Sequence, residues 1–158
     1  MPLEPGRMLR GALAGGISAG VWALQQPLDK RLLRSRYDDV ELLGRALRPR
    51  ADRSDWYPLG LALHVQNGAL FGAAYAGAIA PLLAHAGVPA AARGPLVAQV
   101  ENFGLWPLGR VSDRFHPARG DLPRLTGNRR ALAQATWRHL LFGVALGELE
   151  RRLNPPAA

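Results

Sequence analysis

The stretch that decides the fold runs from Trp56 to Ala92 and reads WYPLGLALHVQNGALFGAAYAGAIAPLLAHAGVPAAA. This stretch contains no Asp, Glu, Lys or Arg. A helix needs about 20 predominantly apolar residues to cross the roughly 30 Å hydrocarbon core of a bilayer. The stretch is longer than that, so it predicts a membrane-spanning helix, which we place at residues 58–83.

Three further apolar segments accompany this stretch, at residues 8–26, 94–109 and 131–147. The first is free of charge from Gly11 to Leu28, whereas the other two are interrupted only by Glu101 and Arg138 respectively. The sequence therefore predicts an all-α fold. We expect a four-span transmembrane helical bundle that forms a single membrane domain over residues 1–158.

The two interrupting charges are opposite in sign. A charge at the centre of a span costs about 2.5–3.5 kcal/mol on insertion scales, and a partner on a neighbouring helix is the usual remedy. Glu101 lies eight residues before Gly109, and Arg138 lies seven after Ala131. At about 1.5 Å rise per residue, each is about 10–12 Å below their shared surface. This count predicts a buried Glu101–Arg138 ion pair.

Small residues recur at four-residue spacing in the first two segments, as at Gly11 and Gly15 and at Gly68 and Gly72. Such spacing aligns small side chains on one helix face and permits close helix packing in membranes. A composition rich in Ala and Gly would also produce the spacing without any packing. The same faces could serve a homo-oligomer.

Basic residues are concentrated in two connections, which hold fourteen of the 20 Lys and Arg. They are Lys30, Arg31, Arg34, Arg36, Arg45, Arg48, Arg50 and Arg53 in the first, and Arg110, Arg114, Arg119, Arg124, Arg129 and Arg130 in the second. Positive residues favour the cytoplasmic side of a membrane. We therefore expect an inner (plasma) membrane protein with both basic loops in the cytoplasm and both termini outside.

The first basic connection also has an apolar periodicity of its own. Leu33, Tyr37, Val40, Leu43 and Leu47 recur at helical spacing among the basic residues. An amphipathic basic helix of this kind can lie on an anionic membrane surface. The sequence thus predicts an extra interfacial helix in this loop, with packing on the ends of the bundle as the alternative.

An internal repeat is indicated by two pairs of matching segments. Residues 10–13, RGAL, resemble residues 93–96, RGPL, and residues 67–74, NGALFGAA, can be laid on residues 138–145, RHLLFGVA. The pattern suggests two helical hairpins in the same orientation, as parallel repeats in membrane proteins are. Low-complexity sequence rich in Ala, Gly and Leu imitates such a repeat.

The stretch from His139 to Gly147, HLLFGVALG, has the form H-x-x-[FY]-G-x-x-x-G. In this it resembles small bacterial inner-membrane proteins of four helices that have no established activity. The second segment departs from the form, because His64 precedes Phe71 by seven residues rather than three. The resemblance implies a membrane bundle and supplies no catalytic residue.

Polar residues inside the predicted spans are the candidate functional residues, since ionisable groups at membrane depth mark functional sites by default. The candidates are His64, Asn67, Glu101, Asn102, Arg138 and His139. A track of His64, Glu101, Arg138 and His139 could relay protons, bind a small solute or hold a lipid headgroup. Interhelical hydrogen bonds that hold the bundle together are the structural alternative. Aromatic residues near the segment ends, among them Trp22 and Trp56, predict an interfacial belt.

Three classes of function remain open to the sequence. The first is a structural, lipid-binding or accessory membrane bundle whose partners are membrane lipids, and the second is a small transporter or proton-conducting protein. The third is a soluble basic nucleic-acid-binding protein, suggested by the net charge of +8. The basic loops offer only Tyr37 and Phe115 for base stacking, so we expect no nucleic-acid partner. No enzyme motif is present, so we expect no catalytic residue, metal or cofactor, although an enzyme with an unfamiliar site stays open.

Overall fold

The computed structural model describes residues 4–155, and every regular element within them is a helix. The prediction of an all-α fold is therefore confirmed. The elements are α1 (Pro5–Leu32), α2 (Asp39–Leu47), α3 (Arg53–Ala74), the π-helical turn η1 (Tyr75–Ile79), α4 (Ala80–His85), α5 (Ala90–Leu105), the 3₁₀ turn η2 (Trp106–Leu108), α6 (Gly109–Phe115) and α7 (Arg129–Leu153).

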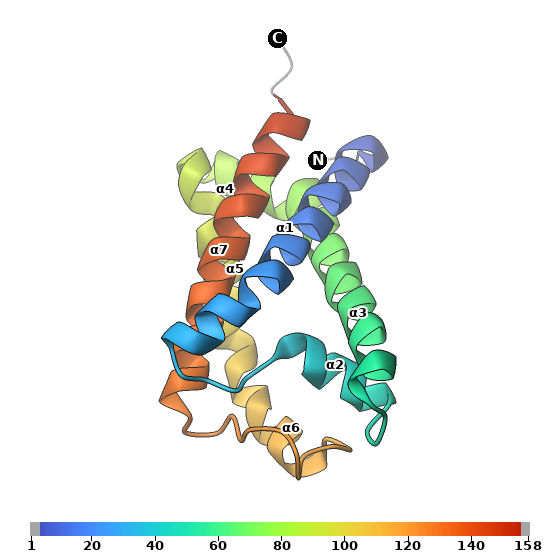
Figure 1. Ribbon diagram of the computed structural model, residues 1–158. Coiled ribbons are helices and arrows are strands. Elements are labelled where there is room, and N and C mark those ends of the chain that lie inside the picture. The colour runs from blue at the N-terminus through green and yellow to red at the C-terminus, as the bar shows by residue number, and fades with distance from the viewer. Residues whose placement is uncertain (1–3, 156–158) are drawn as a thin grey trace.

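The helices α1, α3, α5 and α7 form the body of the molecule (Figure 1). Helix α1 packs against both α3 and α7, and α5 packs against α7. Helices α3 and α5 therefore flank a central pair. Both ends of the described chain lie at one end of the body, and α2 and α6 lie at the other (Figure 1). The two basic connections are thus on the same side of the molecule.

The predicted span at residues 58–83 lies within one continuous helical run, Arg53–His85, formed by α3, η1 and α4. Within residues 4–155, this run is the one stretch that is long and apolar enough to cross a membrane by length and composition. The predicted spans at residues 8–26 and 131–147 lie in α1 and α7, whereas the one at residues 94–109 runs from α5 through η2 to the first residue of α6. Helix α5 has only 16 residues, and α7 contains Arg138 near its middle.

Helix α1 continues beyond the predicted end of its span at residue 26. It passes through Pro27 and ends at Leu32. Asp29 is buried on this extension and lies on the same helix face as the buried Trp22 and Gln26, because a spacing of four and three residues places side chains on one helix face. The extension therefore brings a carboxylate into the interior of the bundle.

Glycine allows α1 and α3 to touch through their backbones. A Cβ atom on Gly15 would lie 2.0 Å from the Gly68 carbonyl oxygen, and one on Gly72 would lie 2.2 Å from the Gly11 carbonyl oxygen. No side chain fits at these distances. The predicted packing of small residues is confirmed for these four glycines. The contact lies within one chain, so this face is not exposed to a second copy.

The same kind of contact joins α5 to α7. A Cβ atom on Gly94 would lie 2.1 Å from the Gly143 carbonyl oxygen. In the repeat suggested by the sequence, Gly94 matches Gly11 and Gly143 matches Gly72. Gly11 and Gly72 are themselves in contact. Equivalent positions of the two hairpins therefore make equivalent contacts.

The first basic connection contains a helix, α2, but it is shorter than the periodicity predicted. It begins after Asp38, whose side chain accepts a hydrogen bond from the Glu41 N–H at 3.0 Å and so caps the helix. Tyr37 therefore lies outside it. Its buried residues, Val40 and Gly44, pack on α3. The helix is thus attached to the end of α3 by a packed face.

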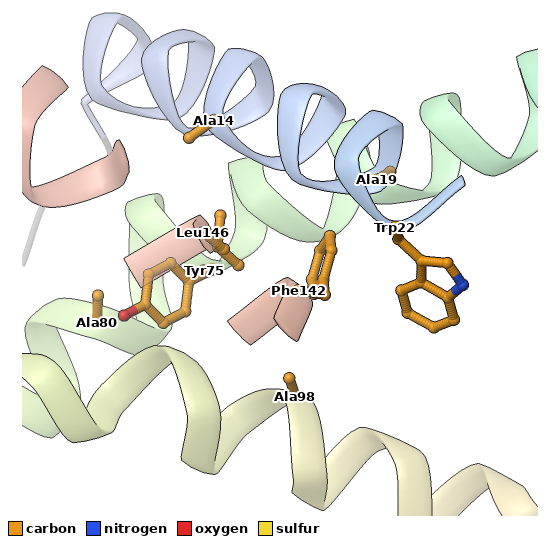
Figure 2. Close-up of a cluster of buried hydrophobic side chains, with 8 residues drawn as sticks. All are labelled: Ala14, Ala19, Trp22, Tyr75, Ala80, Ala98, Phe142 and Leu146. Carbon is orange, nitrogen blue, oxygen red and sulfur yellow. The ribbon is translucent and has the colours of Figure 1, made fainter. Parts of the chain in front are cut away.

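The hydrophobic core is small and consists largely of alanines with a few large side chains. Its buried members are Ala14, Ala19, Trp22, Tyr75, Ala80, Ala98, Phe142 and Leu146 (Figure 2). Phe142 makes edge-to-face contacts with Phe71 and Trp22, at ring-centroid distances of 5.5 and 6.0 Å. Trp22 and Trp56 are both buried, so the predicted interfacial belt is wrong for these two residues.

Candidate functional site

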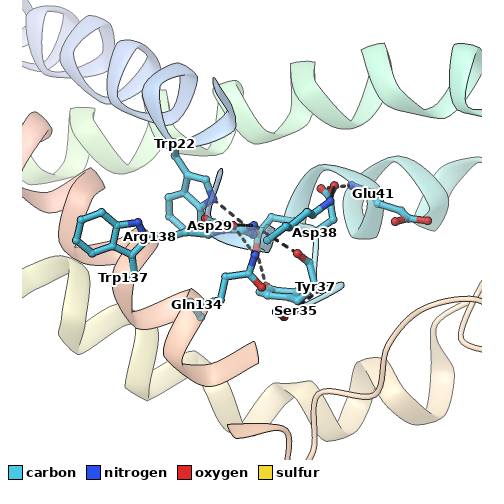
Figure 3. A network of polar contacts seen from close by, with 12 residues as sticks. Trp22, Asp29, Ser35, Tyr37, Asp38, Glu41, Gln134, Trp137 and Arg138 are labelled. Atoms are coloured by element: carbon cyan, nitrogen blue, oxygen red, sulfur yellow. Dashed lines mark hydrogen bonds and ion pairs between the residues drawn. The ribbon is translucent and has the colours of Figure 1, made fainter. Parts of the chain in front are cut away.

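Arg138 is the centre of a buried ionic network (Figure 3). Its side chain is fully buried on α7. The guanidinium donates from Nε and Nη2 to the two oxygens of Asp29, at 2.6 and 2.8 Å, and from Nη1 to Asp39 at 2.6 Å. Bidentate pairing of this kind is among the strongest polar contacts in proteins. The network joins the end of α1, the start of α2 and the middle of α7.

The two carboxylates have further donors around them. Gln134 Nε2 donates to Asp29 at 2.6 Å, and Trp22 Nε1 donates to Asp39 at 3.1 Å. The Tyr37 hydroxyl also donates to Asp39, and its ring lies 5.6 Å from the Arg138 guanidinium carbon. Each carboxylate is therefore compensated in the interior, as a buried charge requires.

Two residues of this network, Tyr37 and Asp39, lie in the connection between α1 and α3, and their pKa values are shifted. Burial opposes ionisation of Asp39, but the Arg138 guanidinium and the Tyr37 hydroxyl hold the pKa of Asp39 below its usual value. Burial, followed by the nearby Asp39 carboxylate, raises the pKa of Tyr37 well above its usual value. Asp39 is therefore an anion and Tyr37 a neutral donor at physiological pH.

The predicted Glu101–Arg138 ion pair is wrong. Arg138 pairs with Asp29 and Asp39, and Glu101 instead faces His139, with 3.9 Å between Glu101 Oε2 and His139 Nε2. Successive residues of a helix point about 100° apart, so Arg138 and His139 face different neighbours. The extension of α1 past Pro27 supplies the partner that the sequence interpretation assigned to α5.

A pocket of about 390 Å³ lies beside the network. Its walls come from every long helix and from both connections. They include Ala19 and Trp22 of α1, Tyr37, Asp39, Leu42 and Leu43 of the first connection, His64, Asn67, Gly68 and Phe71 of α3, Glu101, Asn102, Leu105, Trp106 and Leu108 of α5 and η2, and Ala135, His139 and Phe142 of α7. The volume is at the lower end of the range for small-molecule sites, about 300–1,000 Å³.

Five of the six candidate residues from the sequence line this pocket. They are His64, Asn67, Glu101, Asn102 and His139. The sixth, Arg138, does not line it and is enclosed by the ionic network. Asn102 is buried and donates to Thr136 Oγ1 at 3.3 Å, so it also links α5 to α7.

The two pocket histidines stack against one tryptophan. The Trp22 ring lies 5.1 Å from the His64 ring and 4.7 Å from the His139 ring, both edge-to-face. His139 Nδ1 lies 2.7 Å from the Ala135 carbonyl oxygen, whereas His64 Nε2 is buried without a hydrogen-bond partner. One ring nitrogen at the pocket wall is therefore unsatisfied.

Sequence reasoning missed Asp29, Asp39, Tyr37 and the central position of Trp22. The signal for Asp29 was its spacing of seven residues from Trp22, which continues one helix face beyond Pro27. Asp39 carried a weaker signal, as one of two adjacent acids in a basic connection. Tyr37 belonged to the apolar periodicity of that connection, which concealed its polar role.

The site brings ionisable side chains together with an apolar lining. The part of the chain that the structure describes has no group of three or more His, Asp or Glu placed to hold a metal ion. The pocket combines an apolar lining with two carboxylates and two imidazoles. Comparison of the chain with family models, curated proteins and solved structures gave no match.

Proposed function

We propose that the protein is a four-span integral membrane protein that binds a lipid in the pocket between α3 and α5. The spans are α1, the continuous run of α3, η1 and α4, then α5, and α7. The ionic network around Arg138 holds the bundle together, and the pocket carries the function. The resemblance of residues 139–147 to small bacterial inner-membrane proteins agrees with this proposal.

The observation that carries the membrane assignment is the distribution of side chains on α1. The large apolar side chains exposed on it are Leu9, Leu13, Ile17, Val21, Leu24, Leu28 and Leu32. Apart from Trp22, its buried residues are small or polar, and Leu24 is 83% exposed whereas Asp29 is 2% exposed. Soluble proteins have the opposite arrangement. Membrane proteins place apolar residues toward lipid and ionisable residues toward the interior of the bundle.

The other helices share this arrangement. Large apolar side chains are exposed on α5 at Val100 and Phe103, and on α7 at Leu140 and Val144. Contiguous apolar surface of this extent is uncommon on soluble monomers. A lipid environment accounts for the exposed faces of α1, α5 and α7 together.

The positions of the connections support an orientation. The fourteen basic residues counted from the sequence lie in the connections that contain α2 and α6 or in the adjoining ends of α1, α3 and α7. Helices α2 and α6 lie at the same end of the molecule (Figure 1). By the positive-inside rule this end is cytoplasmic. Both termini then lie outside the plasma membrane.

The pocket supports lipid binding because it opens on the side of the body. Asn67 on α3, Leu105 at the end of α5 and Leu108 in η2 line the pocket and are exposed, so they mark its mouth between α3 and α5. A molecule with an apolar chain can extend from this mouth into the bilayer. Arg138 is closed off from the pocket, which interrupts the polar track needed for proton conduction and favours binding instead.

The four-span arrangement can be tested by single cysteines, since the chain contains no native cysteine. We expect a membrane-impermeant maleimide to label Ala86→Cys, in the turn before α5, from outside and Gly120→Cys, before α7, from the cytoplasmic side. Ile17→Cys, on the exposed face of α1, should react from neither side because a thiol in hydrocarbon does not form the reactive thiolate.

The labelling experiment needs intact spheroplasts and inverted vesicles, with labelling after detergent treatment as the control for reactivity. Labelling of Ala86→Cys and Gly120→Cys from the same side would contradict the predicted number of spans. Rapid labelling of Ile17→Cys in untreated membranes, or recovery of the protein in the soluble fraction without detergent, would show that α1 does not face lipid.

Lipid binding can be tested by blocking the mouth of the pocket. We expect Asn67→Trp to reduce the amount of lipid that copurifies with the protein in native mass spectrometry, because the indole fills the entrance. Leu70→Trp is the matched control, since Leu70 is an exposed residue of α3 that does not line the pocket. Equal lipid retention by the two variants would argue against this pocket as the binding site.

A further inference from the structure

The pocket has an acidic balance of charge. Asp39 and Glu101 line it, and no Lys or Arg does so among residues 4–155. The charge of Asp39 is offset by Arg138. Glu101, with a side chain 33% exposed, has His139 as its nearest charged or ionisable partner. Glu101 therefore places at the pocket wall a carboxyl group that the described chain does not pair with a Lys or Arg side chain.

His139 presents a hydrogen-bond acceptor beside this carboxylate. Its Nδ1 lies 2.7 Å from the Ala135 carbonyl oxygen. A carbonyl only accepts, so Nδ1 carries the proton and Nε2 of the neutral ring is an acceptor. The distance of 3.9 Å between His139 Nε2 and Glu101 Oε2 is too long for a hydrogen bond. A single donor nitrogen at about 2.8 Å from each atom would satisfy both.

His64 adds a third polar atom without a partner. His64 is 8% exposed, lines the pocket, and its Nε2 has no hydrogen-bond partner in the described structure. A buried unsatisfied polar group costs about 1–3 kcal/mol, so a native structure is expected to supply its partner. A polar group of a ligand in the pocket would supply that partner.

Aromatic rings complete the lining. Trp22, Tyr37, Phe71, Trp106 and Phe142 all contribute to the pocket. The faces of such rings carry negative potential and attract cations. An anionic group would meet the Glu101 carboxylate and the ring faces without a basic residue to offset them.

From these contacts, and resting on the lipid-binding function proposed above, we infer that the pocket recognises the ammonium group of a cationic lipid-like amine. The ammonium nitrogen donates to Glu101 and to His139 Nε2, in a pocket that His64 also lines. The alkyl chain leaves past Leu105 and Leu108, which are exposed at the mouth. The hydrocarbon chain and the positive charge are thus both required.

The inference is tested with purified full-length protein in a non-ionic detergent, by isothermal titration calorimetry with four probes. Dodecylamine is the cationic amphiphile, dodecanol and dodecanoate are its neutral and anionic counterparts, and ethanolamine is a short amine. We expect dodecylamine to bind tightest. Glu101→Gln should weaken dodecylamine binding by about tenfold or more, because it removes a charged hydrogen-bond partner.

Glu148→Gln is the matched control, because Glu148 is on the exposed end of α7 and outside the pocket. It should leave dodecylamine binding unchanged, which also corrects for partition of the probe into detergent. Equal binding of dodecylamine, dodecanol and dodecanoate would show that the pocket does not recognise the ammonium group and would overturn the inference. The proposed lipid-binding function would still stand. If ethanolamine bound as tightly as dodecylamine, the alkyl chain would not contribute to binding, and the inference that the ligand is lipid-like would be wrong. Binding of none of the probes would count against the proposed function itself.

Discussion

Replacing Arg138 by methionine should lower the free energy of unfolding by about 3–5 kcal/mol, since truncating one partner of a buried ion pair leaves an uncompensated charge. Asp29 and Asp39 both accept hydrogen bonds from the Arg138 guanidinium. Without it, two carboxylates would be left together in the interior. The measurement is unfolding of the detergent-solubilised protein by denaturant or heat.

Arg152→Met is the matched control for this substitution. Arg152 is also on α7, but its side chain is 69% exposed and pairs with the exposed Glu148. Exposed pairs contribute little to stability, so Arg152→Met should behave almost as the unmodified protein. Similar unfolding of Arg138→Met and Arg152→Met would contradict the assigned importance of the network.

A double-mutant cycle identifies the true partner of Arg138. The change in unfolding free energy for Asp29→Asn combined with Arg138→Met should differ from the sum of the single changes by about 0.5–3 kcal/mol, as for residues in one network. The corresponding cycle between Glu101→Gln and Arg138→Met should be close to additive. The reverse pattern would restore the ion pair predicted from sequence.

The sequence predicted the features that depend on period and composition. The all-α class followed from the apolar segments, and the close-packing faces that contain Gly11, Gly15, Gly68 and Gly72 followed from four-residue spacing. Counting charges also placed the two basic connections on one side of the molecule. Each of these features is local to one helix or depends only on the number of helices, so tertiary contacts are not needed to derive it.

The partner of Arg138 could not be derived in this way. Depth along a helix follows from counting residues, and Glu101 does lie opposite the residue next to Arg138. The direction in which a side chain points around the helix axis depends on how the neighbouring helices pack. The contribution of Asp39 further requires that the chain turn back after Leu32 and return Tyr37 and Asp39 to the interior.

The second large effect is expected at the crossing of α1 and α3, where Gly15→Ala should destabilise the protein by about 1–3 kcal/mol. The added Cβ would lie 2.0 Å from the Gly68 carbonyl oxygen. That atom belongs to the backbone of α3, so the two helices must separate to accept the methyl group. Separation loosens the core around Ala14 and Ala19, which are almost fully buried.

Gly20→Ala on the same helix should have the opposite sign. A Cβ atom on Gly20 would meet nothing within 4 Å, and alanine is favoured over glycine in a helix interior by up to about 1 kcal/mol. Gly20→Ala should therefore raise the unfolding temperature slightly while Gly15→Ala lowers it. A rise for both variants would show that α1 and α3 do not approach through their glycines.

The same comparison in the second hairpin tests whether the two halves are built alike. Gly94 contacts the Gly143 carbonyl as Gly11 contacts that of Gly72, whereas a Cβ atom on Gly104 would be free of contacts. Gly94→Ala should destabilise the protein and Gly104→Ala should not. Since both crossings lie along the body that encloses the pocket, loss of either should also reduce lipid retention, whereas Gly20→Ala and Gly104→Ala should retain it.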